Sequence, residues 1–417
     1  MRSTRLQWLM LILAFLTSLS MHLLLFSYSQ LKESIILEMG LTYGEAGFIF
    51  SMSVLALIIL RIPWGMVIDR LGVRTGAGLA LTFLGVFGLL RGFATNYETL
   101  LLFQLFLGVG LAAVMPCLPK LVSAWFPPEK VGFAIGFSIS GYAVGDVIAL
   151  SGTPYLLTLF GSWRTVSYTY GIWALILTAI WYVLAREPRK NYVTRESCRV
   201  CSDSSLKKDV AALLKIKQVW LLAGLYLSAG ACYDTSLIWL PSILEAEGVE
   251  SVIAGMITSM LPLGFLVASF AVGALSDKFG LRRPFIIFLG LLSGPVIYAT
   301  GVLRGPALWL FTFLIGFCTI GVLTIVLTMP VELPQTTTLV GSAVGLISSV
   351  GNLGSFFMPT MVGYIKDLTG SFLWSVLMLT ILGEFMFILG LPLTETGRKR
   401  KRAGLASVRG DNGVFGY

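Results

Sequence analysis

Charged side chains inside long apolar stretches are the residues of this sequence that could bind an ion. Arg61 stands eight residues before Asp69, so a helix would carry its guanidinium about 12 Å deeper into an apolar layer. A charge at such a depth costs about 2.5 kcal/mol or more unless an anion or a water-filled cavity compensates it. The planar donors of arginine suit an anionic substrate. A salt bridge to Asp146, Asp234 or Glu384 is the structural alternative.

Three other ionisable side chains lie in apolar surroundings: Asp146, Asp234 and His22, the only histidine. An isolated carboxylate in a membrane can carry a proton, so Asp146 and Asp234 are candidates for proton coupling. Each could equally hydrogen-bond to a neighbouring helix. His22 could contact a proton or an anion, or it could be structural. About 22 Å of helix separates Asp146 from the preceding basic loop, which places it away from Arg61 and favours the substrate role for Arg61.

The composition requires lipid around the helices that carry these residues. Of the 417 residues, 56% are hydrophobic and 12% are charged, whereas soluble domains carry about 25% charged residues. Apolar runs of about 20 residues can cross a bilayer as helices. Twelve such runs cover approximately 8–29, 43–68, 77–93, 99–122, 131–158, 164–185, 218–243, 252–276, 283–303, 306–330, 339–364 and 371–394. We therefore predict an all-α membrane protein with twelve transmembrane helices.

The distribution of basic residues predicts the orientation, because cytoplasmic loops retain Lys and Arg. With the N-terminus inside, all but six of the 30 Lys and Arg residues fall in cytoplasmic segments. Arg61 lies within a helix, and the five on the outer side are Lys32, Arg91, Arg164, Arg304 and Lys366. We expect both termini in the cytoplasm and a multi-pass chain in the cell (inner) membrane. The basic tail 398–402 would contact anionic lipid headgroups rather than nucleic acid.

A charged loop that follows the second apolar run returns 208 residues later, after the eighth run. Its first copy contains Gly65, Asp69, Arg70, Gly72 and Arg74, and its second copy contains Gly273, Asp277, Lys278, Gly280 and Arg282. Glycines let neighbouring helices approach closely, and the charges can pair at the membrane surface. We expect a twofold repeat in which both loops act as a gate.

Both copies match the pattern G-x-x-x-D-[RK]-x-G-x-[RK], in which the chain resembles the major facilitator superfamily of secondary transporters. The resemblance covers nearly the whole chain. It implies two pseudo-symmetric six-helix halves around a central cavity, which work by alternating access. We expect an N-terminal half at 1–185, a cytoplasmic linker at 186–217, a C-terminal half at 218–395 and a basic cytoplasmic tail at 396–417.

Two short motifs, L-R-I-P at 60–63 and G-N-L-G at 351–354, resemble the nitrate/nitrite porter branch. In that branch one arginine on helix 2 and another on helix 8 hold the anion, but Ser269 occupies the second position in this chain. Cyanate-permease-like and oxalate/formate-exchanger-like carriers share the general pattern. The resemblance implies a small anion, either an inorganic monovalent anion or a short carboxylate. The candidate substrate-binding residues are Arg61, Asn352, His22 and Ser269, although Asn352 could instead join two helices.

Other function classes fit the sequence less well. The alternatives are a proton-coupled carrier of another small metabolite or a drug, and a membrane sensor that does not transport. One histidine and scattered cysteines do not form a catalytic site, so no enzyme is expected. Cys198 and Cys201 lack a partner pair, so no metal site or cofactor is expected. We expect a monomer in the lipid bilayer with a small-molecule substrate and with protons or a counter-anion; symport, exchange and uniport stay open.

Overall fold

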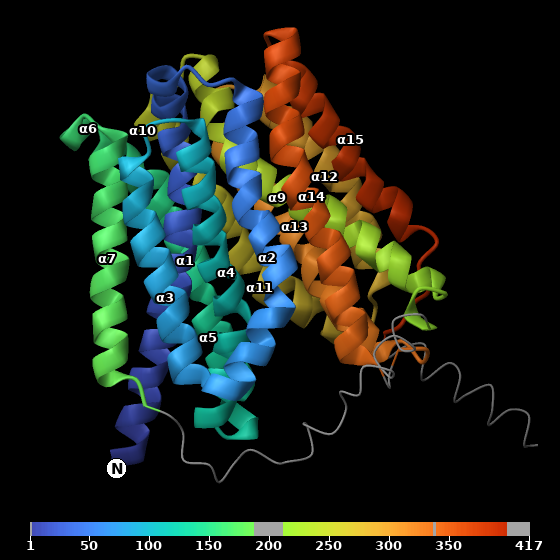
Figure 1. Cartoon of the computed structure of the whole chain (residues 1–417). Coiled ribbons are helices and arrows are strands. Elements are labelled where there is room, and N and C mark those ends of the chain that lie inside the picture. The colour runs from blue at the N-terminus through green and yellow to red at the C-terminus, as the bar shows by residue number, and fades with distance from the viewer. Residues whose placement is uncertain (1, 187–211, 337–338, 398–417) are drawn as a thin grey trace, which may run out of the picture. The chain divides into compact units, whose positions relative to one another are not determined.

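The structure is a computed structural model that describes residues 2–186, 212–336 and 339–397. These residues form helices joined by short loops, with no strand among them (Figure 1). The helices are α1 (Arg2–Met39), α2 (Tyr43–Leu71), α3 (Val73–Leu90), η1 (Arg91–Phe93), α4 (Tyr97–Trp125), α5 (Pro128–Val147), η2 (Ile148–Gly152), α6 (Thr153–Phe160), α7 (Trp163–Leu184), α9 (Lys217–Ala246), α10 (Ser251–Thr258), α11 (Met260–Phe279), α12 (Arg283–Val302), α13 (Ala307–Glu332), α14 (Val340–Thr369) and α15 (Leu373–Gly390). The predicted all-α class is therefore confirmed.

Twelve helical segments are long and apolar enough to cross a membrane, judged by length and composition. This number confirms the prediction. Two of the spans are interrupted: the fifth joins α5, the π-helical turn η2 and α6, and the eighth joins α10 and α11 across Ser259. A π-helical turn inside a helix often marks a functional site, and η2 begins two residues after Asp146.

Capping side chains and glycines determine where helices begin and end. At the start of α2, Thr42 accepts a hydrogen bond from the backbone N–H of Glu45, and the Glu45 carboxylate accepts one from the N–H of Thr42. Gly72 (φ 86°) and Gly280 (φ 66°) lie in the two signature loops, which we define as residues 65–74 and 273–282. Residues other than glycine rarely adopt such φ angles. Each copy of the loop therefore needs its glycine for the backbone itself.

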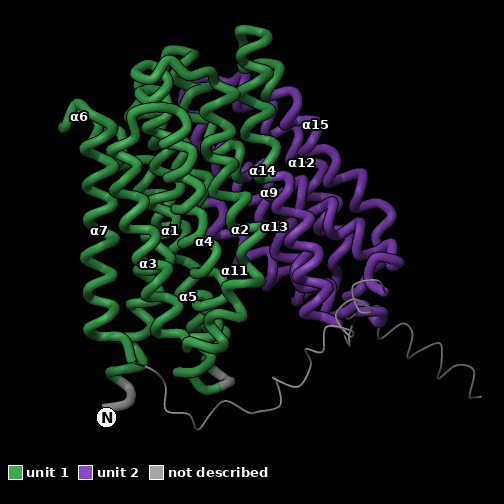
Figure 2. The backbone as a smooth tube through the Cα atoms, viewed as in Figure 1, with its two compact units in different colours: residues 1–199, 234–263, 355–375 green, residues 200–233, 264–354, 376–417 purple. Residues whose placement is uncertain are grey.

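The chain divides into two compact units (Figure 2). Unit 1 comprises Met1–Arg199, Asp234–Leu263 and Ser355–Ser375, and unit 2 comprises Val200–Tyr233, Gly264–Gly354 and Val376–Tyr417. Unit 1 thus holds the first six spans together with all of α10, parts of α9, α11 and α14, and the first residues of α15. The division into halves at 1–185 and 218–395 stays a prediction. Most of the predicted linker, including Cys198 and Cys201, and the tail from residue 398 lie outside the described residues.

Two of the cations that the sequence places on the outer side are buried. Lys32 lies within α1, which continues to Met39, and Arg91 lies in η1, which extends α3; both residues have 0% exposure. The Lys32 ammonium donates to the Ser242 hydroxyl and lies 4.9 Å from the centroid of the Trp239 ring. The outer-side assignment of both cations stays a prediction. Lys32 lies in a helix because α1 continues beyond its apolar run.

The guanidinium group of Arg91 donates hydrogen bonds to neutral oxygen atoms. It donates from Nη1 to the carbonyl oxygen of Leu24 (3.0 Å) and from Nη2 to the hydroxyl of Ser27 (2.9 Å). A buried charge needs such partners, because leaving it without hydrogen bonds costs several kcal/mol. Lys32 and Arg91 are therefore structural cations, which distinguishes them from Arg61.

Candidate functional site

Arg61 is a half-buried cation in the second half of α2. Among the described residues it forms no ion pair and no hydrogen bond, so no intramembrane carboxylate compensates it as the structural alternative requires. Its charge acts on the hydroxyl group of Tyr142 in α5. The donors of Arg61 are thus available to a ligand, and a partly desolvated guanidinium interacts strongly with an anion.

His22 and Asp146, which are 124 positions apart, form a pair between α1 and α5. Nδ1 of His22 lies 2.8 Å from Oδ1 of Asp146. The Asp146 side chain is 2% exposed and the His22 side chain is 15% exposed. The imidazole also stacks on the Tyr142 ring, with centroids 4.4 Å apart and an interplanar angle of 18°. Because a carboxylate accepts hydrogen bonds, Nδ1 of His22 is the donor in this pair.

Two glycines of α5 allow this pair to form. A Cβ at Gly141 would lie 2.5 Å from the carbonyl oxygen of Phe15, and a Cβ at Gly145 would overlap the carbonyl oxygen of Leu19. Both contacts are with α1, so these glycines let the two helices approach closely. At Gly132, nearer the start of α5, a Cβ would meet no atom within 4 Å. Glycine is therefore required for the close approach at the level of the His22–Asp146 pair and not at position 132.

Asp234 belongs to the same region of unit 1. Its carboxylate interacts with Ser355 and lies within electrostatic range of His22 and Asp146. The structure thus brings together three of the residues that the sequence singles out. We call Arg61, Tyr142, His22, Asp146 and Asp234 the central cluster.

Asn352 and Ser269 lie in unit 2. Asn352 is half-buried and makes no hydrogen bond with any described residue, so its amide is open to a ligand. The hydroxyl of Ser269 donates to the carbonyl oxygen of Leu266 in its own helix at 2.9 Å. Their assignment to the substrate site stays a prediction.

The first signature loop holds its charges at the end of α2. Asp69 pairs with Lys120 of α4, and Nη2 of Arg74 donates to the carbonyl oxygen of Tyr182 at 2.6 Å. Arg70 is exposed. A Cβ at Gly65 would meet nothing within 4 Å, so the expected close helix contact does not occur at this glycine. The loop therefore fastens α2 to α4 and α3 to α7 within unit 1.

Arg282 is the centre of the second signature loop. It donates from Nη2 to Glu332 (2.7 Å) and Asp277 (2.6 Å), and the Glu395 carboxylate accepts from its backbone N–H at 2.8 Å. The hydrogen bond to Glu332 and the charge of Asp277 raise the pKa of Arg282 further above its usual value, although burial opposes the shift. Arg282 is therefore always cationic and holds the end of α13 and the segment after α15. Lys278 is exposed, and Gly273 has only a side-chain methyl group at 3.7 Å.

We expect Asp69→Asn to leave the fold intact and to slow transport several-fold. The pair with Lys120 is exposed, so its loss should change the free energy of unfolding by about 1 kcal/mol or less. A gate needs contacts that differ between its states, and we expect the pair with Lys120 to be one of them. Transport by Asp69→Asn and by Lys120→Met, measured in proteoliposomes at matched protein content, should fall to similar extents. Wild-type rates in both variants would remove the pair from the gate.

The sequence interpretation missed several partners of the predicted residues. Tyr142 stands four residues before Asp146 and therefore on the same helix face, a spacing that could have revealed it. Lys120 follows two prolines at the end of the fourth span, on the same side as Asp69. Glu332 and Glu395 have no comparable signal, because their approach to Arg282 depends on how α12, α13 and α15 pack.

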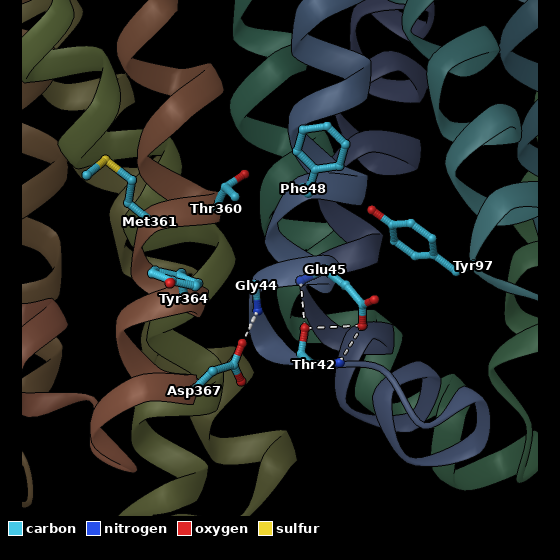
Figure 3. A pocket seen from close by; sticks show the side chains of 9 residues that line it. All are labelled: Thr42, Gly44, Glu45, Phe48, Tyr97, Thr360, Met361, Tyr364 and Asp367. Carbon is cyan, nitrogen blue, oxygen red and sulfur yellow. Dashed lines mark hydrogen bonds between the residues drawn. The ribbon is translucent and has the colours of Figure 1, made fainter.

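At the end of unit 1 opposite its signature loop, α2 lies against the segment 355–375. The Asp367 carboxylate accepts hydrogen bonds from the backbone N–H groups of Tyr43 (2.9 Å) and Gly44 (2.7 Å), and Figure 3 shows it at the start of α2. A Cβ at Gly47 would overlap the carbonyl oxygen of Pro359. No larger side chain fits between these helices, so this contact is closed; we call it the closed end.

A cavity of about 510 Å³ lies beside the closed end (Figure 3). Its lining residues are Thr42, Gly44, Glu45, Phe48, Tyr97, Thr360, Met361, Tyr364 and Asp367. None of these nine residues is cationic, and the carboxylates of Glu45 and Asp367 both cap the start of α2. The charge of this cavity disfavours an anion, which leaves Arg61 as the better candidate for one.

Known proteins similar to this chain are transporters. A D-galactonate transporter of Escherichia coli O6:H1 (strain CFT073) is 27% identical over 357 residues, covering 79% of this chain and 82% of that protein. A probable nitrate/nitrite antiporter, NarK1, of Thermus thermophilus is 26% identical over 394 residues, covering 84% and 83%. The crystal structure of a bacterial homolog of the human lysosomal transporter Spinster, inward-facing and unoccupied, has the same fold, with a TM-score of 0.75, 18% identity and coverage of 92% and 97%.

The family model for the Major Facilitator Superfamily matches residues 10–359 and 248–410. These matches confirm the resemblance to this superfamily and to its nitrate/nitrite porters, and they confirm that the chain is not an enzyme. With its twelve spans and its two signature loops, this chain belongs to the Major Facilitator Superfamily of membrane transporters.

Proposed function

We propose that this protein is a secondary active transporter of a small monovalent anion, which it binds at Arg61 and moves by alternating access. The observation that carries the proposal is the state of the Arg61 side chain. It is half-buried in a transmembrane helix and pairs with no described residue. In contrast, Lys32 and Arg91 donate hydrogen bonds to oxygen atoms of the protein. An arginine in this position is costly unless a ligand or water compensates it.

The relatives support an anion as the substrate class. D-Galactonate is a carboxylate, and nitrate and nitrite are inorganic anions, so the names of both relatives refer to monovalent anions. A carboxylate and a nitrate ion share the geometry that matches the two-pronged donors of one guanidinium. Ser269, rather than a second arginine, occupies the position that the repeat relates to Arg61. One arginine matches a single carboxylate or nitrate group better than it matches a dianion. Asn352, with two donors and one acceptor, stays a separate candidate for substrate binding.

Alternating access requires two gates that open in turn. We assign the outer gate to the closed end and the inner gate to the two signature loops, with both termini in the cytoplasm and the chain in the inner membrane as a monomer. The closed end then represents the outward-closed state. The hydrogen bonds of Asp367 to the start of α2 would break when this end opens.

A binding screen tests the proposal. Nitrate, nitrite, formate, oxalate and D-galactonate form a suitable panel, which we call the anion panel, with glucose and a cationic drug as controls. Purified wild-type protein should gain thermal stability with at least one monovalent anion of the panel and with neither control, since a ligand stabilises the state that binds it. Stabilisation by the drug alone, or by nothing in the panel, would contradict the proposal.

A further inference from the structure

We propose that the anion binds together with a proton, and that this proton is taken up by Nε2 of His22. This inference rests on the proposed function and determines its coupling: the protein would be a proton/anion symporter. The geometry of the central cluster carries it. Nδ1 of His22 is hydrogen-bonded to Asp146, and the imidazole stacks on the Tyr142 ring. The charge of Arg61 acts on the hydroxyl group of Tyr142.

The charges of the central cluster do not favour an anion by themselves. It contains one permanent cation, Arg61, and two carboxylates, Asp146 and Asp234, which influence each other and His22 electrostatically. With His22 neutral and both carboxylates ionised, the cluster carries one net negative charge. A bound monovalent anion would add a second negative charge in a partly desolvated region, where like charges repel strongly.

Protonation of His22 removes this obstacle. The added proton forms an N–H bond at Nε2, the imidazolium keeps its hydrogen bond to Asp146, and the pair becomes neutral. The cluster with the anion then has the same net charge as the empty cluster. His22 thus supplies the positive charge that a second arginine would otherwise provide, and it can release the proton when the anion leaves.

Four described titratable side chains lie near His22 or interact with its neighbours. Titratable neighbours are Asp146 and Tyr142 on α5, Arg61 on α2, and Asp234. Between residues 99 and 119, α4 contains no ionisable group other than a cysteine thiol. On α7, Trp173 donates to the Ser20 hydroxyl of α1 at 3.0 Å. Asp234 is therefore the one rival proton acceptor in the region.

Because anion binding and proton uptake are coupled, the direction of the proton transfer determines how anion affinity changes with pH. If binding takes up one proton, affinity for an anion that stays ionised should rise as the pH falls, by up to about tenfold per pH unit. We expect nitrate and D-galactonate, tested separately, to bind at least about tenfold more tightly at pH 6 than at pH 8. Asp146→Asn should flatten this dependence, because the amide no longer stabilises an imidazolium.

The single histidine provides a direct readout. Full-length protein labelled with 15N-histidine, carrying a purification tag without histidine, should give one imidazole spin system. At a constant pH of about 7.5, adding nitrate or D-galactonate should convert the neutral Nδ1–H tautomer to imidazolium. A pH-indicator dye in weakly buffered solution should report uptake of about one proton per bound anion.

Substitutions distinguish His22 from Asp234 as the group that takes up the proton. His22→Asn keeps a donor near Asp146 but cannot titrate, so proton uptake should fall below half of the wild-type value. The exposed control Glu250→Gln should retain it, and Asp234→Asn tests the rival acceptor. Uptake that survives in His22→Asn and disappears in Asp234→Asn would overturn the assignment.

The inference and the proposed function fail in different ways. Binding that depends on Arg61 but leaves the imidazole signal and the proton count unchanged would refute symport through His22 and preserve the anion carrier. Failure of nitrate, D-galactonate and the rest of the anion panel to bind would contradict the proposed function, and the proton inference would fall with it.

Discussion

Arg61→Gln should abolish measurable binding of the transported anion while the helices remain folded. Losing one partner of a desolvated charge pair costs about 2 to 5 kcal/mol, which corresponds to a loss of at least about 25-fold in affinity. The fold should survive, because Arg61 makes no ion pair or hydrogen bond with any described residue. Isothermal titration with the anion that binds wild-type protein measures the effect directly.

Two further variants make the Arg61 result specific. Arg61→Lys keeps the charge but replaces the planar fork with a point charge, so affinity should fall by about tenfold rather than vanish. Arg5→Gln, at an exposed position near the start of α1, should bind as the wild type does. Equal losses in Arg61→Gln and Arg5→Gln would mean that Arg61 acts only through the overall charge of the protein.

Gly145→Ala should separate α5 from α1 and destabilise the protein by about 1 to 3 kcal/mol, the usual cost of overpacking. The new Cβ would overlap the carbonyl oxygen of Leu19 and lie 3.2 Å from Cβ of His22. Backbone atoms cannot move aside as a flexible side chain can. The shift should lengthen the hydrogen bond between His22 and Asp146 and change the imidazole signal. Thermal unfolding in detergent and the imidazole spectrum together measure this effect.

Gly132→Ala is the matched control for Gly145→Ala. It makes the same chemical change on the same helix, at a position where a Cβ would meet nothing within 4 Å. Alanine is the better helix former by about 1 kcal/mol, so this variant should be at least as stable as the wild type. Equal destabilisation of both variants would show that close packing on α1 is not the reason for glycine at 145.

Apolar composition and the repeated loop were sufficient to predict the class of the fold. Runs of about 20 apolar residues have few alternatives to membrane helices, and twelve spans are found. The ends of the helices were harder to predict. Lys32 lies beyond the predicted run 8–29, but α1 continues to Met39 and buries this side chain. Arg91 lies within the predicted run 77–93, and its complete burial could not be read from the sequence.

The candidate site could be predicted as a set of residues but not as an arrangement. Ionisable side chains in apolar runs identified Arg61, His22, Asp146 and Asp234. That His22 binds Asp146 depends on the contact of α1 with α5, for which Gly141 and Gly145 are the main sequence signal. The position of Asp146 in the membrane was predicted only from its distance along one helix. This distance could not show that Tyr142, one turn away, is influenced by Arg61.

Transport by reconstituted protein tests the central claim, that this carrier moves a small anion held by Arg61. Proteoliposomes with wild-type protein or with Arg61→Gln, at equal protein content, would be loaded with each labelled member of the anion panel under an inward proton gradient. Wild-type protein should accumulate at least one monovalent anion, and Arg61→Gln should take up no more than empty liposomes do. Equal uptake of that anion by both proteins would contradict the claim.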